Sequence, residues 1–197
     1  MVLMFMDSIT FILLLAFAAP ASALPCGHIP RLRPLDPESL QLLSAGIRQS
    51  PTLRQLATEL GSSDVIVHIM TTRPRPRKSP AALQFVTSSG GFRFVRIRIT
   101  TSVSRRRGIA LLAHELQHAR EVAGAASIVD EASFEAYYRR VGMVVDHDSV
   151  HRTYDTTAAR QAEDVVFAEL AVDAIGNAGT RLELREERSM QPRPTRR

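Results

Sequence analysis

Cysteine, tryptophan and lysine are almost missing from this chain of 197 residues, which has one cysteine, no tryptophan and a single lysine. The lone cysteine, Cys26, cannot form an intramolecular disulfide framework, so the fold must rest on its hydrophobic core and on any metal ion that it binds. The chain also has no internal repeat. Its length and its 45% of hydrophobic residues suit one globular domain rather than two.

The near absence of lysine leaves arginine as 24 of the 25 basic residues, since Lys78 is the only lysine. Such a skew is more typical of genomic base composition than of a nucleic-acid surface, and no recognised nucleic-acid motif accompanies it. We therefore predict no nucleic-acid partner. The net charge of +5 and the basic loop 73–78 allow weak contact with an anionic cell-envelope surface, although a solvated loop is the simpler interpretation.

The N-terminal segment has the pattern of a secretory signal peptide. Residues 9–19 form an almost unbroken apolar run, shorter than the about 20 residues of a membrane-spanning helix, and a small-x-small cleavage pattern ends at Ala23. We therefore predict removal of residues 1–23 and export to the periplasm or the extracellular space. One alternative is a retained anchor, because the segment has Asp7 and no Lys or Arg. Another is a lipid on Cys26, which the preceding proline disfavours.

The rest of the chain divides into three parts. Closely spaced prolines mark an extended segment, residues 24–35, because proline fixes its own backbone and biases the preceding residue away from helix. Residues 36–180 are predicted to form the folded domain. The tail, residues 181–197, is charged and rich in arginine, and we expect it to be disordered.

Two short helices are expected at the start of the domain. Regular structure begins near Asp36, after which leucines recur at helical spacing. Ser50 and Pro51 have the pattern of an N-cap followed by proline at the first helical position, and Gly61 should end this second helix.

A change of period then predicts a sheet. Residues 65–72 are rich in β-branched side chains, residues 83–87 form another apolar run, and residues 92–101 alternate apolar side chains with arginine. The glycines within residues 88–91 suit a hairpin turn, because glycine accepts the positive φ that such turns need. We expect an antiparallel sheet with one face on helices and the other facing solvent or a cleft. His68 is interpreted as a core histidine.

Two helices are expected after the sheet. Ser104 should cap a helix that ends near Gly124, and Asp130 should cap another that ends at Gly142.

The region after Gly142 is expected to be a polar loop followed by a final helix over residues 157–175. His147 and His151 in this loop have the four-residue spacing of metal ligands on a helix. Because they lie among charged residues in a predicted loop, we interpret them as solvated.

The residues most informative about function are His114, Glu115 and His118, in the helix that follows Ser104. Positions four apart lie one turn apart on the same helical face, so both imidazoles can reach one zinc ion. Glu115 is placed to contact a water molecule rather than the metal, and it can accept a proton as general base. Uncharged neighbours such as Leu116 suit a buried active-site helix. The arrangement predicts hydrolysis of peptide bonds.

This helix, the predicted hairpin before it and the helix after it resemble the zincin metallopeptidase superfamily, and most nearly its small single-domain gluzincin members. The resemblance covers roughly residues 65–141, and only the five-residue motif is specific. It implies that the strand before the motif helix, residues 92–101, binds substrate backbone by strand addition. Arg120 stands where the family usually has an apolar residue, and the third histidine of the metzincin variant is absent.

A catalytic zinc needs a third protein ligand. The resemblance implies a glutamate from the next helix, near twenty residues past the second histidine, which favours Glu135 with Glu131 as its rival. Glu121 fits better as the hydrogen-bond partner of a ligand than as a ligand. Asp155 and Glu169 are more distant alternatives.

A tyrosine could donate a hydrogen bond to the developing oxyanion. Tyr154, which lies outside the predicted helix faces, is the candidate that we prefer to Tyr137 and Tyr138. Packing in the core or at its rim is the more ordinary role for all three.

The sequence therefore predicts an α+β domain, a small antiparallel sheet packed on helices with a zincin-like active-site helix. The predicted function is an exported Zn²⁺-dependent metallopeptidase acting on a peptide or protein substrate. Its predicted metal ligands are His114, His118 and Glu135, and its predicted catalytic residues are Glu115 and Tyr154. The alternative is a non-enzymatic exported protein of the same fold that binds cell-envelope polymers or a protein partner.

Overall fold

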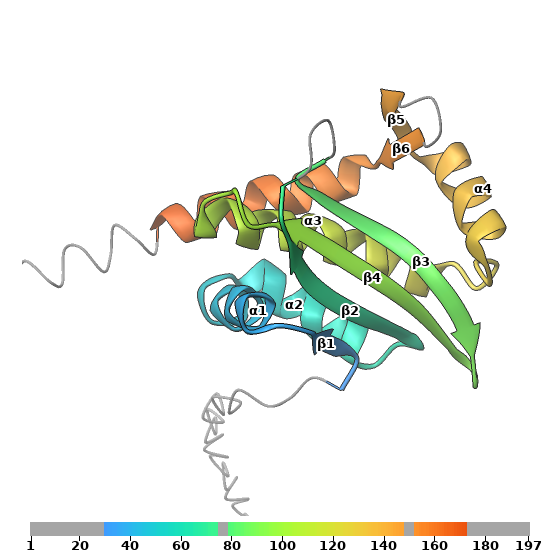
Figure 1. Cartoon of the computed structure of the whole chain (residues 1–197), viewed down its shortest axis with the longest axis horizontal. Coiled ribbons are helices and arrows are strands. Elements are labelled where there is room, and N and C mark those ends of the chain that lie inside the picture. Colours follow the sequence, from blue (N-terminus) through green and yellow to red (C-terminus); the bar gives the residue numbers. More distant parts are fainter. Residues whose placement is uncertain (1–29, 75–78, 148–151, 173–197) are drawn as a thin grey trace, which may run out of the picture.

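A computed structural model describes residues 30–74, 79–147 and 152–172 of the chain (Figure 1). The predicted leader and tail, Cys26 and His151 lie outside the described residues. The elements combine into an α+β domain, so the predicted class is confirmed at this level. Within the part of the chain that is described, no helix is both long and apolar enough to cross a membrane.

Ten elements carry labels in Figure 1. In chain order they are β1 (Leu32–Pro34), α1 (Pro37–Gln49), α2 (Pro51–Gly61), β2 (Val65–Thr72), β3 (Ala81–Ser89), β4 (Phe92–Thr100), α3 (Arg105–Gly124), α4 (Glu131–Val141), β5 (Met143–His147) and β6 (Arg152–Asp155). A final helix, described over residues 157–172, follows β6.

The helices begin and end where the capping residues predict. Asp36 and Ser50 accept hydrogen bonds from backbone N–H groups in the first turns of α1 and α2, and proline follows each of them. Ser104 caps α3 and Asp130 caps α4 in the same way. These local predictions are confirmed, because an N-cap satisfies free N–H groups within its own turn of helix.

The four-stranded sheet is mixed, with the strand order β1-β2-β4-β3. β3 and β4 form the predicted hairpin, with Gly90 and Gly91 at φ values of 58° and 77° in its turn. However, β1 pairs with β2, and β2 with β4, in parallel. The prediction of a wholly antiparallel sheet is therefore wrong. The hairpin turn determines only how β3 pairs with β4. It does not determine which strand pairs with the other side of β4, and in the structure that strand is β2, with β3 at the edge of the sheet.

This order also changes which strand is free to bind a peptide. β4, predicted to add a substrate strand, is hydrogen-bonded on one side to β2 and on the other to β3. Its backbone groups are already used within the sheet. The edge of the sheet nearest in sequence to the motif helix is β3 instead.

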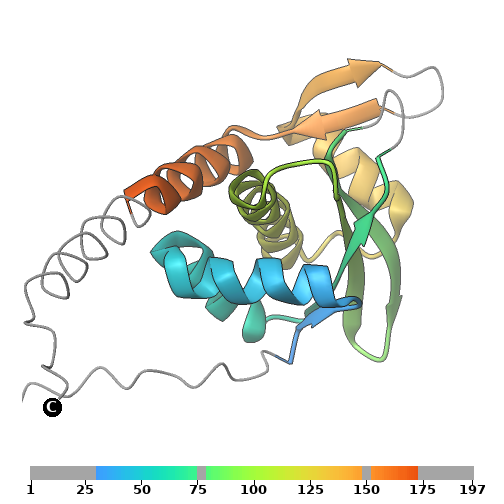
Figure 2. The same cartoon turned by 60° about the vertical axis from the view of Figure 1, so that its left-hand side comes forward.

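Helices α1, α2 and α3 lie on one side of the four-stranded sheet (Figure 2). The inward side chains of β4, Val95, Ile97 and Ile99, are buried in the same core as Leu112 and Leu116 of α3. Burial of α3 against the sheet holds the motif helix in one orientation, because core packing is dense and tolerates little movement.

The region predicted as a polar loop instead contains a second sheet, in which β5 and β6 pair antiparallel. His147 lies at the end of β5, so the loop prediction is wrong there. The final helix then begins at residue 157, as predicted. It packs against α2 through Glu169, whose carboxylate accepts hydrogen bonds from the hydroxyl groups of Ser50 and Thr52. Both β6 and this final helix contact α3, through Asp155 and Glu163.

Candidate metal centre

The site is built on the middle of α3, where His114, Glu115 and His118 occupy neighbouring positions. Glu115 and His118 are each only 5% exposed. The two imidazole rings are 4.9 Å apart between centroids, so the four-residue spacing does place them on one helical face.

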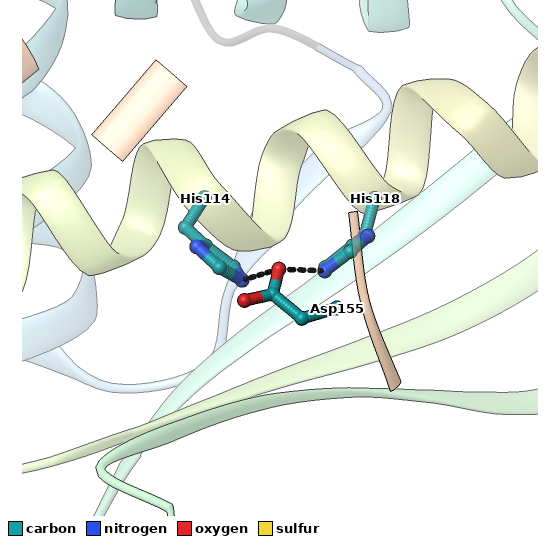
Figure 3. Close-up of side chains that lie close together, drawn as sticks. All are labelled: His114, His118 and Asp155. Atoms are coloured by element: carbon teal, nitrogen blue, oxygen red, sulfur yellow. Dashed lines mark ion pairs between the residues drawn. The ribbon is translucent and has the colours of Figure 1, made fainter. Parts of the chain in front are cut away.

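The third member of the cluster is Asp155, the last residue of β6. Figure 3 shows its carboxylate between the two rings, with Oδ1 3.3 Å from Nε2 of His114 and 3.8 Å from Nε2 of His118. Ligand atoms of a tetrahedral zinc, about 2.1 Å from the metal, lie roughly 3.4 Å from one another. The three side chains are therefore already near the spacing that a shared zinc ion requires.

Each histidine is held from behind by a carboxylate. Nδ1 of His114 lies 2.9 Å from Glu163 of the final helix, and Nδ1 of His118 lies 2.9 Å from Glu121 of α3. A histidine that donates Nδ1–H to a carboxylate presents the lone pair of Nε2 on its other side, which is the arrangement common at metal sites. In both rings this free nitrogen is the one that faces Asp155.

Glu121 and Glu163 are themselves positioned by further polar groups. The Thr156 hydroxyl donates to Glu121 at 2.7 Å, and the Tyr138 hydroxyl lies 3.1 Å from the same carboxylate. Arg107, in the first turn of α3, forms an ion pair with Glu163. The orientation of both rings is thus determined by several elements at once.

The carboxylate oxygen that faces the two rings is within ion-pair distance of both imidazoles, but it has no hydrogen-bond partner among the described residues. Oδ2 of Asp155 accepts a hydrogen bond from Arg160 at 2.6 Å. Oδ1, by contrast, is buried without a hydrogen-bond partner in the described part of the chain. Buried polar atoms are rarely left in this state. Two imidazole nitrogens and one carboxylate oxygen are a donor set that zinc takes, so the residues present fit the predicted metal.

The histidines differ in their affinity for protons. Burial and the neighbouring His118 lower the pKa of His114, although Asp155 and Glu163 oppose this shift. For His118, burial disfavours the charged form, but the hydrogen bond with Glu121 and the surrounding carboxylates outweigh it and raise the pKa. A metal ion would therefore compete with a proton mainly at His118.

The side chain of Glu115 leaves α3 on the side next to the one that carries the imidazole rings of His114 and His118. Burial raises its pKa to about 7, and the charge of His118 and a hydrogen bond from the backbone of Leu83 only partly offset this rise. A carboxyl group with such a pKa can take up or release a proton near neutral pH. Leu83 belongs to β3, so Glu115 lies beside the edge strand of the sheet.

Glu135, the predicted third ligand, is not brought to the histidines. Its side chain on α4 is 54% exposed and forms an ion pair with Arg139 at 2.7 Å. The group of side chains that could hold a metal ion is His114, His118 and Asp155, and Glu135 is not part of it. Glycine at position 142 ends α4 and the chain turns into β5, so the carboxylate that returns to the site comes from β6, the strand that pairs with β5.

The other candidate carboxylates have separate places. Glu131 is exposed in the first turn of α4. Glu121 lies behind His118, as the sequence led us to expect. Glu169 binds Ser50 and Thr52 at the start of α2.

Tyr154 is next to Asp155 in β6, and its ring packs against the hydrophobic core. Successive side chains of a strand point to opposite faces, so the orientation of Asp155 toward the histidines turns Tyr154 away. Its hydroxyl oxygen is buried and has no hydrogen-bond partner among the described residues. A role for Tyr154 at the oxyanion stays a prediction.

Sequence reasoning missed Glu163, Arg107 and Thr156. Glu163 is 49 positions from His114 along the chain, and no spacing rule connects the two. The sequence contained one signal for this region: Asp155 and Thr156 directly precede the predicted final helix, where aspartate and threonine usually act as N-caps. Thr156 does cap the final helix, through a hydrogen bond from the N–H of Ala159.

Comparison of the chain with protein-family models, with curated protein sequences and with solved structures found no match. The chemistry of the site is therefore argued from its own residues.

Proposed function

We propose that the protein is a zinc-dependent peptidase of zincin-like type, in which His114, His118 and Asp155 hold the metal and Glu115 is the general base. The observation that carries the proposal is the buried, unpartnered Oδ1 of Asp155 facing two Nε2 atoms, with Glu115 one residue from the first histidine. An aspartate as third ligand departs from the gluzincin pattern, so the proposal is for the wider superfamily.

Zinc, when bound, would supply a Lewis acid that polarises a carbonyl group and makes a water molecule more acidic. The chain's own residues would do the rest. Glu115 would accept a proton from that water and later return it to the leaving amine. Glu121 and Glu163 would accept hydrogen bonds from Nδ1 of the two imidazoles and so keep Nε2 of each ring directed at the metal.

The position of β3 supports a peptide as the substrate. β3 is an edge strand, and the backbone of its residue Leu83 hydrogen-bonds Glu115. An extended peptide that paired with this edge by strand addition would run past the carboxylate that is to act as base. This role replaces the one that the sequence assigned to residues 92–101.

The decisive experiment compares the wild-type chain with Glu115→Gln. Zinc content is measured on each purified protein, and cleavage is measured on a diverse peptide library so that sequence preference does not hide activity. We expect about one zinc per chain in both proteins, because Glu115 is not a ligand. Cleavage should fall by about 10² to 10⁴ in the variant, the usual contribution of a general base.

Two outcomes would count against this proposal. A folded wild-type protein that takes up no zinc would remove the metal centre. Equal cleavage by the wild type and by Glu115→Gln would remove the assigned base. A matched control is Glu135→Gln, an exposed carboxyl group on α4, which should change neither zinc content nor cleavage.

A further inference from the structure

The face of the four-stranded sheet that turns away from α3 carries a cluster of arginines. In the register of the sheet, Arg33 of β1 lies opposite His68 of β2, and His68 lies opposite Arg96 of β4. Side chains at alternate positions of a strand share a face, so Arg31 and Arg98 belong to the same side. We call Arg31, Arg33, Arg96 and Arg98 the arginine face.

The burial pattern confirms that these side chains point outward. Along β4 the residues alternate between buried and half-buried, and the buried set of Val95, Ile97 and Ile99 lies in the core. Arg96 and Arg98 are in the half-buried set. His68 is half-buried too, so its interpretation as a core histidine is wrong. Figure 1 shows the sheet in front of α3, and none of the labelled helices crosses its near side.

Little acidic charge lies near these arginines, since the carboxylate on which Arg31 acts, that of Asp64, already forms an ion pair with Arg93. The strands β1 to β4 contain no aspartate or glutamate. Within the described ranges, none of the four arginines forms an ion pair with a carboxylate, whereas Arg93 on the inner side of β4 does so with Asp64. The positive charge is felt locally, since burial, Arg33 and Arg96 together lower the pKa of His68.

The aromatic rings on this side are already engaged. The guanidinium of Arg31 lies 4.4 Å from the centre of the Phe92 ring, and His68 stacks on Phe94 with ring centroids 6.2 Å apart. Stacking of nucleic-acid bases on a protein needs free ring faces. These contacts occupy the rings with Arg31 and His68, so the feature that remains for a partner is the array of positive charges.

We propose that the arginine face docks the protein on an anionic phospholipid surface. The arginines lie on β4 and in and just before β1, on either side of β2, rather than along one strand, and a two-dimensional array matches a layer of headgroups better than a single linear polymer. Arginine also binds phosphate oxygens with two parallel hydrogen bonds. The proposal needs no metal and is independent of the proposed peptidase activity.

The test measures binding of the full chain to vesicles in the presence of EDTA. One set of vesicles is phosphatidylcholine alone, and the other is an equal mixture of phosphatidylcholine and phosphatidylglycerol. The apolar segment 9–19 is present throughout, so the ratio of the two partition coefficients reports the contribution of charge. We expect the wild type to prefer the anionic vesicles at least about tenfold and to lose this preference in high salt.

The variant Arg96→Gln/Arg98→Gln should lower binding to the anionic vesicles by about tenfold or more, because each basic residue near such a surface contributes roughly a factor of five. Arg96→Lys/Arg98→Lys keeps both charges and should stay within about threefold of the wild type. The control Arg48→Gln/Arg105→Gln removes two exposed arginines from α1 and α3, with the same change in net charge, and should also stay within this limit. Circular dichroism verifies that each variant is folded.

Three results would overturn the proposal. The wild type could show no preference for anionic vesicles. The control on α1 and α3 could lose as much binding as the variant on β4, which would reduce the effect to net charge. Finally, the wild type could bind a single-stranded oligonucleotide but not the vesicles, and the face would then belong to a nucleic acid.

Discussion

Two clusters of charged side chains contact α3, and they differ in whether every hydrogen-bonding group in them has a partner. Near the C-terminal end of the helix, Arg93 binds both carboxylate oxygens of Asp64 at 2.7 and 2.8 Å. The same guanidinium donates to backbone carbonyl oxygens after the last turns of α3, including those of Val122 and Ala125. Every hydrogen-bonding group here has a partner within the protein.

At the middle of α3, the cluster of His114, His118 and Asp155 is also polar, and it is largely buried, but one carboxylate oxygen has no hydrogen-bond partner in the part of the chain that the structure describes. A closed cluster stabilises a fold, since removal of one member leaves an uncompensated charge. An open cluster retains an acceptor that an external cation can use. The two clusters therefore differ in whether a buried oxygen is left available to a cation.

The largest effect should come from the closed cluster. We expect Arg93→Met to lower the free energy of unfolding by about 3 kcal/mol, because it leaves several backbone carbonyl groups at the end of α3 without a donor, whereas the half-exposed carboxylate of Asp64 can be solvated. Urea unfolding measures this loss. The zinc affinity of the folded variant should stay within about threefold of the wild type, since Arg93 does not contact the histidines. If Arg93→Met lost much of its zinc affinity while its stability stayed unchanged, Arg93 would belong to the metal site and would not have a structural role.

The open cluster should show the opposite response. Asp155→Asn should weaken zinc binding by at least about a hundredfold, more than the loss of a residue that merely supports a ligand. The stability of the metal-free protein should fall by only about 1 kcal/mol, because an amide oxygen can still accept the hydrogen bond from the half-exposed Arg160 and only the charge of the carboxylate is lost.

Titration with a competing chelator measures the affinity, and Glu135→Gln serves as the control. If Glu135→Gln lost the metal and Asp155→Asn kept it, the ligand set inferred from sequence would be right and the one inferred from the structure wrong.

A smaller effect is expected one step further from the metal. Glu163→Gln replaces the carboxylate behind His114 by a neutral amide, and we expect zinc affinity to fall by about 10- to 100-fold. Asp164→Asn changes the next residue of the same helix, which is exposed, and should leave the affinity unchanged. Absorption spectra of the cobalt-substituted protein would show altered ligand geometry in the first variant alone.

The smallest effect concerns pH and again belongs to the closed cluster. Hydrogen bonds from Arg93 lower the pKa of Asp64 below its ordinary value of 3.8. A group with a lower pKa in the folded state contributes stability above its unfolded pKa and loses that contribution as pH falls through its folded value. Unfolding experiments between about pH 5 and pH 2 should therefore show declining stability, with a shallower decline in Asp64→Asn. An unchanged slope in this variant would contradict the expectation.

Much of the local structure could be predicted because it depends on neighbours in sequence. Asp36, Ser50 and Ser104 cap helices through hydrogen bonds that span three residues. The turn at Gly90 and Gly91 likewise requires only a positive φ at two adjacent positions. The pair of histidines on α3 belongs to the same class, since the geometry of one helical turn suffices to bring them together.

Predictions that depended on distant segments were less successful. β4 was expected at a position where it could add a substrate strand, yet it lies inside the sheet between β2 and β3. Glu135 was expected at the metal because it lies on the next helix at a familiar distance along the chain. The hairpin of β5 and β6 and the docking of the final helix by Glu169 place Asp155 there instead.

The sequence by itself determined the helix that presents two imidazoles and a carboxyl group, because every interaction needed lies within a few residues. Only the tertiary structure decided which carboxylate faces those imidazoles, which strand is the open edge, and that four arginines share one side of the sheet. These outcomes depend on packing between segments far apart in the chain, where many acidic residues and strand orders are compatible with the same local pattern.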